Sequence, residues 1–316
     1  MKLLYAANKR KGSHLQLNRF LAACKHNVRV AAYKGQNYDC YIDWTLDALC
    51  DVFTGEYCPD SIATEIYHDQ VRRYAPDLII SDCESITTSI GKDLNIPVWQ
   101  VSPLLLHYGF SKPNELSFTV KYPSLFNRYD YSDIMRELTK TSDRSFVYSH
   151  LCDLGVPIKS GIEWIRPYSS VAAKSELFQH NAVAVSFDYN KPLIHRLKTI
   201  EDSILFTEAD NEKHPVALKS LSDATEYYGN IRNANMLIMP GCADLLADAF
   251  YNEKFVWMLP DFACQEITAN ILITEYLSLG KAVYDIKKNP IEPMPDIPPI
   301  EMNAAIRTLD EEIDKL

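Results

Sequence analysis

Long apolar runs are missing from this sequence. None approaches the ~18 to 20 residues that a membrane span requires, so no transmembrane segment is expected. The N-terminus, MKLLYAANKRK, has only five consecutive apolar residues, whereas a signal-peptide core needs roughly 7 to 15. We therefore expect this stretch to form a first β-strand of a cytoplasmic protein.

Closely spaced cysteine pairs are missing too. None of the eight cysteines belongs to a C-x-x-C pair, and several lie inside apolar segments. A zinc site or a disulfide framework would need tighter spacing, so we expect reduced, mostly buried thiols and no metal site. They are Cys24, Cys40, Cys50, Cys58, Cys83, Cys152, Cys242 and Cys264.

Net positive charge is also missing. The formal net charge is −10, which argues against non-specific nucleic-acid binding by the whole surface. A local basic patch is still present, because Lys9, Arg10 and Lys11 are consecutive.

What the sequence does contain indicates a two-domain α/β protein. Its 316 residues correspond to two domains of about 150 residues each. Hydrophobic residues make up 47% and charged residues 23%, which is ample for a core. Short apolar runs alternate with longer amphipathic ones, a pattern typical of parallel sheets covered by helices on both faces.

The expected elements follow this alternation. Strands are predicted at Lys2–Ala7, Val28–Tyr33, Asp77–Ser81, Pro97–Ser102, Ala182–Phe187, Ser203–Phe206, Val216–Leu218, Asn235–Met239, Phe255–Leu259 and Ala282–Tyr284, with a further candidate at Cys50–Phe53. Helices are predicted at Leu15–Cys24, Ile62–Tyr74, Ser85–Leu94, Ala243–Tyr251, Gln265–Leu279 and, closing the chain, Glu301–Leu316.

Two segments do not fit the alternation. Lys288–Pro299 contains five prolines and cannot be regular structure. Tyr108–Tyr131 is rich in aromatic residues and prolines, and we expect a loop there. Its aromatic side chains could line an acceptor groove or could pack the loop itself; they include Tyr122, Phe126, Tyr129 and Tyr131.

Three segments in chain order carry motifs. The first runs from Gly12-Ser13-His14 to Arg19, directly after the first expected strand. The second reads PDLIISDCE from Pro76 to Glu84, before a helix and a strand that begins with IPV. The third, within Gly241–Asp285, contains ADAFYNEKFVWMLPD, QEITAN and YLSLGKAVYD.

Together these segments resemble the inverting, GT-B-fold glycosyltransferases related to the N-acetylglucosaminyltransferase of peptidoglycan synthesis, in particular their small prokaryotic and phage branch. There are departures. Ser13 stands where that branch has a glycine, and Asp248 where it has the glutamate that holds the ribose. Phe255 replaces a proline and Ile267 a glutamine, which leaves the sugar open.

The resemblance implies a GT-B architecture, with two Rossmann-like, doubly wound domains that face a cleft and a closing C-terminal helix. Residues 1–160 would bind the acceptor and residues 161–290 the nucleotide sugar, and 291–316 would be a proline-rich linker and the helix. The implied activity is transfer of a sugar from a nucleotide-diphosphate donor, with inversion and without a metal or cofactor. Oligomeric state is left open.

His14 and Asp82 are the candidates for the catalytic base. The ordinary pKa of histidine suits proton transfer at neutral pH, and His14 follows the first expected strand. Asp82 and Glu84 follow the third expected strand. Their alternative role is a helix cap with an acid in the first turn. Asp82-Cys83-Glu84 could also be read as a D-x-D metal site, although the downstream motifs favour the metal-free design.

Donor-binding candidates gather in the second half. Gly241 and Cys242 precede a helix whose N-terminus could hold the diphosphate. The resemblance implies that Asp248 binds the ribose hydroxyls of the nucleotide. Glu266 and Asn270 lie four residues apart on one helix face, where they could bond sugar hydroxyls or be solvated. Asn190, after an expected strand, could meet phosphate.

The acceptor candidates lie in the first half and include the basic run. Such a run could steer an anionic acceptor, such as a phosphate-bearing lipid-linked sugar or a hydroxymethylated base in DNA; its alternative is a solvated loop. The residues are Lys9, Arg10, Lys11, Gly12, Ser13, Glu84 and His107.

Two other functions remain open. One is a non-catalytic GT-B protein that binds a nucleotide or a glycan, and the other is a nucleotide-sugar epimerase or hydrolase.

Overall fold

The computed structural model describes residues 1–34, 38–47, 61–109, 132–172, 174, 179–207, 217–219, 224–261 and 264–316. Contacts divide the chain into two units: the first holds the described residues of 1–109, 132–166 and 304–316, and the second those of 167–303. The strand candidate Cys50–Phe53 and most of the expected loop, including Tyr122, Phe126, Tyr129 and Tyr131, lie outside the described residues.

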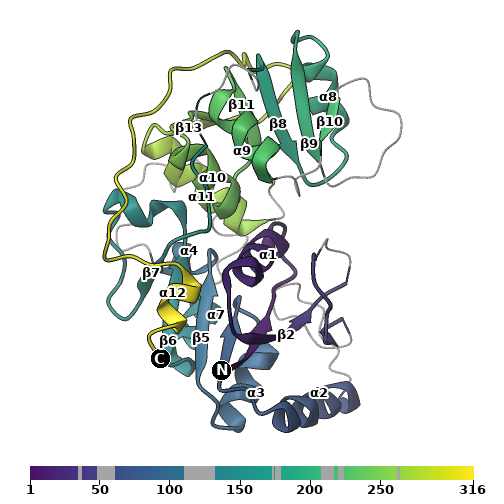
Figure 1. The fold of residues 1–316 in the computed structure, drawn as a ribbon, viewed down its shortest axis with the longest axis vertical. Coiled ribbons are helices and arrows are strands. Elements are labelled where there is room, and N and C mark those ends of the chain that lie inside the picture. The colour runs from purple at the N-terminus through teal and green to yellow at the C-terminus, as the bar shows by residue number, and fades with distance from the viewer. Residues whose placement is uncertain are drawn as a thin grey trace. The chain divides into compact units, whose positions relative to one another are not determined.

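A parallel sheet forms the centre of the first unit (Figure 1). Its described strands pair in the order β3-β2-β1-β4-β5-β6-β7, and every pairing is parallel. The strands are β1 Lys2–Ala6, β2 Asn27–Ala32, β3 Trp44–Thr45, β4 Leu78–Ser81, β5 Val98–Ser102, β6 Arg144–Tyr148 and β7 Glu163–Ile165. The helices are α1 Ser13–Ala23, α2 Ser61–Tyr74, α3 Ser85–Asp93, α4 Leu105–Gly109, α7 Ser132–Thr141 and α12 Leu309–Ile313, with a 3-10 turn, η2, at His150–Leu154.

The second unit has a parallel sheet of the same design. Its described strands pair in the order β10-β9-β8-β11-β12-β13, again all parallel. They are β8 Ala182–Ser186, β9 Ser203–Thr207, β10 Ala217–Lys219, β11 Leu237–Pro240, β12 Val256–Leu259 and β13 Gly280–Ala282. The helices are α8 Lys191–Leu197, α9 Ala224–Asn233, α10 Ala243–Tyr251 and α11 Gln265–Tyr276. Of the described helices in either unit, none combines the length and apolar character needed to cross a membrane.

The central strands are apolar along most of their length because both faces are covered. In β1 the residues after Lys2 are fully buried, and every residue of β4, β8 and β11 is buried. In the first unit, Leu4, Ile79 and Val98 form one core cluster with Tyr67 of α2 and Ile90 of α3. A strand buried on both faces reads as a continuous apolar run, as this sequence does at these positions.

In both sheets the chain adds strands first on one side of its first strand and then on the other, and we call this change of side the strand reversal. In the first unit, β2 and β3 extend the sheet on one side of β1, and β4 to β7 extend it on the other. The second unit repeats this order around β8, with the reversal between β8 and β11. In open α/β sheets, ligands bind outside the carboxyl ends of the strands that flank such a reversal. The loops after β1 and β4, and those after β8 and β11, are therefore where each unit should carry its site.

The elements predicted within the described residues are confirmed except for the closing helix, although the last predicted strand is displaced by two residues to Gly280–Ala282. The sequence analysis did not assign the short strands β3, β6 and β7, or the helices α4, α7, α8 and α9. Among the described cysteines, Cys83, Cys152, Cys242 and Cys264 are buried, Cys24 and Cys40 are half-buried, and none of the six is in a disulfide.

The predicted closing helix Glu301–Leu316 is wrong in its extent, since only Leu309–Ile313 is helical. Thr308 begins this helix with a capping box. Its side chain accepts from the third helical residue, and its own N–H donates to Glu311 Oε2 (2.9 Å). A capping residue has an extended backbone, which ends the helix on its N-terminal side.

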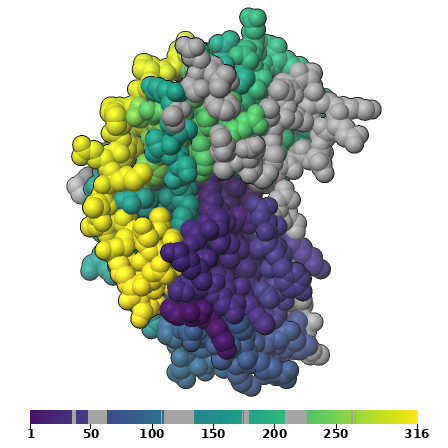
Figure 2. Space-filling view, viewed as in Figure 1, coloured from purple at the N-terminus to yellow at the C-terminus, as the bar shows by residue number. Residues whose placement is uncertain are grey.

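The proline-rich segment before α12 is irregular, as predicted, and Figure 2 shows the C-terminal residues, in yellow, on the molecular surface. Several hydrogen bonds attach the segment to the rest of the second unit, two of them to or from the backbone of Glu253 and the side chain of Trp257. Trp257 Nε1 donates to the Glu292 carbonyl oxygen (3.0 Å), and the Ile297 N–H donates to the Glu253 carbonyl oxygen (2.8 Å).

Gly91 provides a test of the packing between α3 and its sheet. A Cβ there would lie 2.5 Å from Val98 Cγ2 and 2.8 Å from Ile79 Cδ1. Alanine is favoured over glycine in a helix by ~1 kcal/mol, but overpacking costs about 1–3 kcal/mol. We expect Gly91→Ala to lower the free energy of unfolding by up to about 2 kcal/mol in urea. Ser89→Ala, on the exposed face of α3, should not lower it, and an equally stable Gly91→Ala would contradict this packing.

Candidate active site

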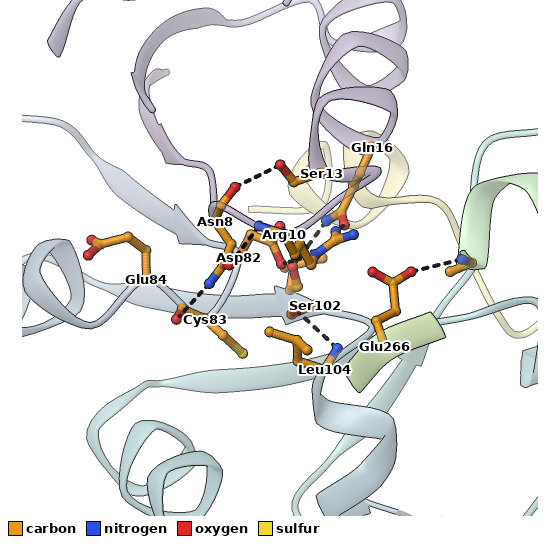
Figure 3. Close-up of polar contacts among 12 residues, drawn as sticks. Asn8, Arg10, Ser13, Gln16, Asp82, Cys83, Glu84, Ser102, Leu104 and Glu266 are labelled. Atoms are coloured by element: carbon orange, nitrogen blue, oxygen red, sulfur yellow. Dashed lines mark hydrogen bonds and ion pairs between the residues drawn. The ribbon is translucent and has the colours of Figure 1, made fainter. Parts of the chain in front are cut away.

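Two loops of the first unit meet at its strand reversal, and Asn8 holds them together (Figure 3). The side chain of Asn8 donates from Nδ2 to the Cys83 carbonyl oxygen (3.4 Å) and accepts at Oδ1 from the Arg10 backbone N–H (3.1 Å). Its carbonyl oxygen accepts from the Ser13 hydroxyl (2.7 Å). The loop after β1 is thus tied to the loop after β4 and to the start of α1.

A buried ion pair lies between the same loops. Arg10 Nε is 3.0 Å from Asp82 Oδ2 and 3.2 Å from Oδ1, and the two side chains are 4% and 0% exposed. Arg10 Nη2 also donates to Gln16 Oε1, and Gln16 Nε2 donates to the Val101 carbonyl oxygen (3.0 Å). Burial raises the pKa of the Asp82 carboxyl, and the charge of Arg10 with the hydrogen bonds from Ser102 and Arg10 offsets this only in part. The predicted base Asp82 is therefore engaged by a guanidinium.

His14, the other predicted base, is the second residue of α1 and is 4% exposed. Gly12 begins the helix with φ 86°, in the left-handed region that favours glycine. The hydroxyl of Ser13 is hydrogen-bonded to Asn8 and to Tyr38, and burial raises the pKa of Tyr38 to about 12. Gly12 and Ser13 thus shape the turn that sets His14 at the strand reversal.

The basic run divides into two environments. Lys9 and Lys11 are exposed, whereas the Arg10 guanidinium is buried and faces Asp82. Only the two lysines can present charge to a solvent-borne acceptor. His107 lies in α4, and its side chain is outside the description.

Glu84 caps α3. Its Oε1 accepts from the Ile86 N–H (3.0 Å) and its Oε2 from the Thr87 N–H (2.6 Å), which is the capping alternative considered above. The carboxylates of Asp82 and Glu84 are thus directed to different partners. Within the described residues, no group of three or more His, Cys, Asp or Glu side chains is placed to hold a metal ion.

The candidate donor residues of the second unit surround the turn from β11 into α10. A Cβ at Gly241 would lie 2.6 Å from Ile271 Cγ1, so glycine lets α11 pack closely against this turn. Glu266 Oε1 accepts from the Ala243 N–H (2.8 Å), and Asn270 Nδ2 donates to the Gly241 carbonyl oxygen (2.9 Å). Glu266 and Asn270 are buried and bond to the backbone of this turn.

Asp248 and Asn190 also have partners inside the second unit. Asp248, fully buried in α10, accepts from the Tyr227 hydroxyl at Oδ2 (2.9 Å). Asn190, after β8, caps α8 by accepting from the Leu193 N–H at Oδ1 (3.0 Å). Cys242 is the N-terminal capping position of α10, and its backbone there is extended.

The sequence analysis missed several polar residues of the first reversal, namely Asn8, Gln16, Tyr38 and Ser102. For Gln16 the sequence held one indication, since this residue stands between Leu15 and Leu17 near the start of a predicted helix. The structure shows that Gln16 is fully buried. Asn8 directly follows the first predicted strand, a position that could have been included on the same grounds as Lys9.

Two parallel sheets, each with the Rossmann strand order, define the GT-B fold, and this chain has it. No protein-family model matches the chain, and no curated protein matches it either.

Solved glycosyltransferase structures do match. Spinosyn forosaminyltransferase SpnP is 14% identical, with 90% of this chain and 85% of that chain covered and a TM-score of 0.53. UGT2 of Phytolacca americana, solved with UDP-2fluoro-glucose and pterostilbene, is 11% identical over 89% and 85%, with a TM-score of 0.53. A UDP-glucosyltransferase from Polygonum tinctorium is 11% identical over 89% and 84%, with a TM-score of 0.55. At these identities the likeness is one of fold.

The Arg10–Asp82 pair can be tested through stability. Arg10→Met leaves a buried carboxylate without its counter-charge, which should cost about 3–5 kcal/mol. The folded-state pKa of Asp82 is already raised by burial, and loss of Arg10 raises it further. The folded protein therefore takes up a proton as the pH falls, so the loss should be smaller at about pH 5 than at about pH 7.

Urea unfolding of the single variants and of Arg10→Met/Asp82→Asn measures this coupling. The double variant should recover part of the loss, because no charge is left unpaired. Simple additivity of the two single losses would contradict the ion-pair account.

Proposed function

We propose that this protein is a glycosyltransferase that uses a nucleoside-diphosphate sugar as its donor. The observation that carries the proposal is the N-terminus of α10, which lies at the strand reversal of the second unit directly after Gly241 and Cys242. Backbone N–H groups and the helix dipole favour phosphate at such a position. The fold shared with a structure solved with UDP-2fluoro-glucose supports the same choice of donor.

Donor binding would exchange hydrogen bonds that the protein now makes to itself. The diphosphate would take the Ala243 N–H from Glu266, whose carboxylate would then accept from sugar hydroxyls. Asn270 Oδ1 is buried without a hydrogen-bond partner among the described residues, and a sugar hydroxyl would supply a donor. Asp248 would exchange the Tyr227 hydroxyl for those of the ribose.

For the transfer we propose His14 as the general base. It would take the proton of the acceptor hydroxyl while the acceptor oxygen attacks the anomeric carbon from the face opposite the diphosphate. The bond between the anomeric carbon and the diphosphate breaks, and its electron pair leaves with the diphosphate oxygen. Attack from the opposite face inverts the configuration. The N-terminus of α10 would stabilise the departing diphosphate in place of a metal. His14 is preferred over Asp82 because the Asp82 carboxylate is fully buried and engaged by the Arg10 guanidinium, which keeps it from an acceptor hydroxyl.

We propose an anionic acceptor, since the exposed Lys9 and Lys11 flank the loop that leads to His14. A phosphate-bearing lipid-linked sugar and a hydroxymethylated base in DNA would both bring phosphate groups together with the acceptor hydroxyl. Two exposed lysines attract an anion within about 10 Å at moderate salt.

A second candidate function is nucleotide or glycan binding without transfer. It is favoured by the contacts that engage the predicted catalytic and donor groups, namely Arg10 on Asp82 and the α10 turn on Glu266 and Asn270. Donor hydrolysis and transfer assays with a panel of nucleotide sugars separate the two functions.

The donor site predicts stabilisation by a nucleoside diphosphate in the presence of EDTA. Ligand at 100 times its dissociation constant should add roughly 2.7 kcal/mol to the free energy of unfolding. A thermal-shift screen of UDP, GDP, ADP and dTDP measures it. Asp248→Asn should weaken the response, whereas Asp202→Asn, before β9 at the opposite edge of the sheet, should not. No shift with any of the four nucleotides would exclude the donor site.

The base assignment predicts that His14→Ala lowers kcat while nucleotide affinity stays unchanged. Loss of a general base typically costs about 10² to 10⁴ in rate. Steady-state kinetics with titration of the diphosphate measures both quantities, and His68→Ala on α2 is the matched control. If His14→Ala kept full activity while a folded Asp82→Asn lost it, the base would be Asp82.

A further inference from the structure

A cavity of about 630 Å³ lies at the amino-terminal edge of the second unit's sheet. Arg232 and Asn233 line it from the end of α9, Asn235 from just before β11 and Lys254 from just before β12. In a parallel sheet this edge is opposite the carboxyl ends, where Gly241 and α10 lie. The cavity is therefore separate from the candidate donor site, and its size is that of a small-molecule site.

The proline-rich segment lines the cavity with Pro293, Met294 and Asp296. Asp296 Oδ1 is 2.7 Å from Lys254 Nζ, and Oδ2 is 3.3 Å from Lys174 Nζ. Burial raises the pKa of Asp296, but the hydrogen bonds and charges of Lys254 and Lys174 outweigh it and lower the pKa overall. Asp296 is thus an anion with a lysine on each oxygen, and the two lysines offset its charge.

Two of the three guanidinium nitrogens of Arg232 lack an acceptor among the described residues. Its Nη2 is 2.9 Å from Glu253 Oε2, but Nε and Nη1 are enclosed and have no hydrogen-bond partner in the part of the chain that the structure describes. The side chain is 11% exposed. An enclosed donor without an acceptor costs about 1–3 kcal/mol, and a bound oxyanion would supply acceptors in the planar arrangement that a guanidinium prefers.

The charges and the amides together define the ligand. Lys174, Arg232 and Lys254 outnumber Asp296 and Glu253, so this region is locally positive on a chain of net charge −10. Asn233 and Asn235 line the cavity beside the cations. Their Nδ2 atoms donate to the Gly229 carbonyl oxygen (2.6 Å) and to Asn181 Oδ1 (3.1 Å), and an amide oxygen has two lone pairs with which to accept from hydroxyl groups. We propose that this cavity is a second ligand site, which binds a small polyhydroxylated oxyanion such as a sugar phosphate.

Titration calorimetry of the full chain at constant ionic strength tests the site, with glucose 6-phosphate, inorganic phosphate and glucose as probes. Glucose 6-phosphate should bind saturably, phosphate more weakly and glucose not measurably. Excess UDP should leave this binding unchanged. Arg232→Gln should weaken it by roughly ten-fold or more, since a hydrogen bond to a charged group contributes about 1.5–3 kcal/mol.

Two lysine variants control for a loss of folding in Arg232→Gln and for a general effect of surface charge. Lys174→Gln removes an exposed lysine of the cavity and should also weaken binding, whereas Lys198→Gln, an exposed lysine after α8, should not. The proposal is overturned by three results: no saturable binding of glucose 6-phosphate, displacement by UDP, or equal weakening in Lys198→Gln. Phosphate binding as tight as that of glucose 6-phosphate would overturn the polyhydroxylated part of it.

Discussion

Parallel pairing of one strand with two neighbours, which the chain adds on opposite sides of it, is the constraint on which both units depend. β1 pairs with β2 and β4, and β8 pairs with β9 and β11. Each parallel connection must cross over the sheet, so helices cover both faces and the central strands become apolar. At the reversal the connections diverge, and the loops at the carboxyl ends there are free to carry polar residues.

The two reversals use this freedom differently. In the first unit, Arg10 and Asp82 form a buried ion pair, and Asn8 bonds across to the same loop. Such a pair adds little net stability, but removal of one partner is costly, so its main effect is to hold the loops in one arrangement. In the second unit, the turn before α10 is held by Glu266 and Asn270, which leaves a helix N-terminus at the reversal. These arrangements are the basis for proposing a base in the first unit and an anion site in the second.

The amino edge of the second sheet shows a third use of charge. There the cations hold the proline-rich segment in place through Asp296, and the same cations line a cavity. Attachment of a chain segment and binding of a ligand can share one set of residues, because each lysine and arginine has more than one donor.

How much was predictable from the sequence follows from the range of the interactions. Central strands such as β1 and β11 were predictable because burial on both faces leaves an uninterrupted apolar run. The strand β3 has two residues and β7 begins with the exposed Glu163, so neither shows a strong periodicity. The order of the motifs was enough to select His14, Asp82 and Gly241 as candidate site residues. The burial of the Arg10 side chain was not predictable, because it depends on Asp82, 72 residues away.

The capping role of Glu84 was recognisable from local spacing, since its bonds reach only to Ile86 and Thr87. The hydrogen bond from the Ala243 N–H to Glu266 spans 23 residues, and no local sequence pattern indicates it. Contacts set by tertiary packing were the ones that the sequence analysis could not assign.

Hydrogen–deuterium exchange of the full chain with and without UDP tests most directly whether the carboxyl edge of the second unit is the donor site. The account predicts slower exchange in residues 187–194 and 241–248, which follow β8 and β11, and unchanged exchange in 232–236 at the opposite edge. Bound UDP that slowed exchange only in 232–236, or left 241–248 unaffected, would contradict it.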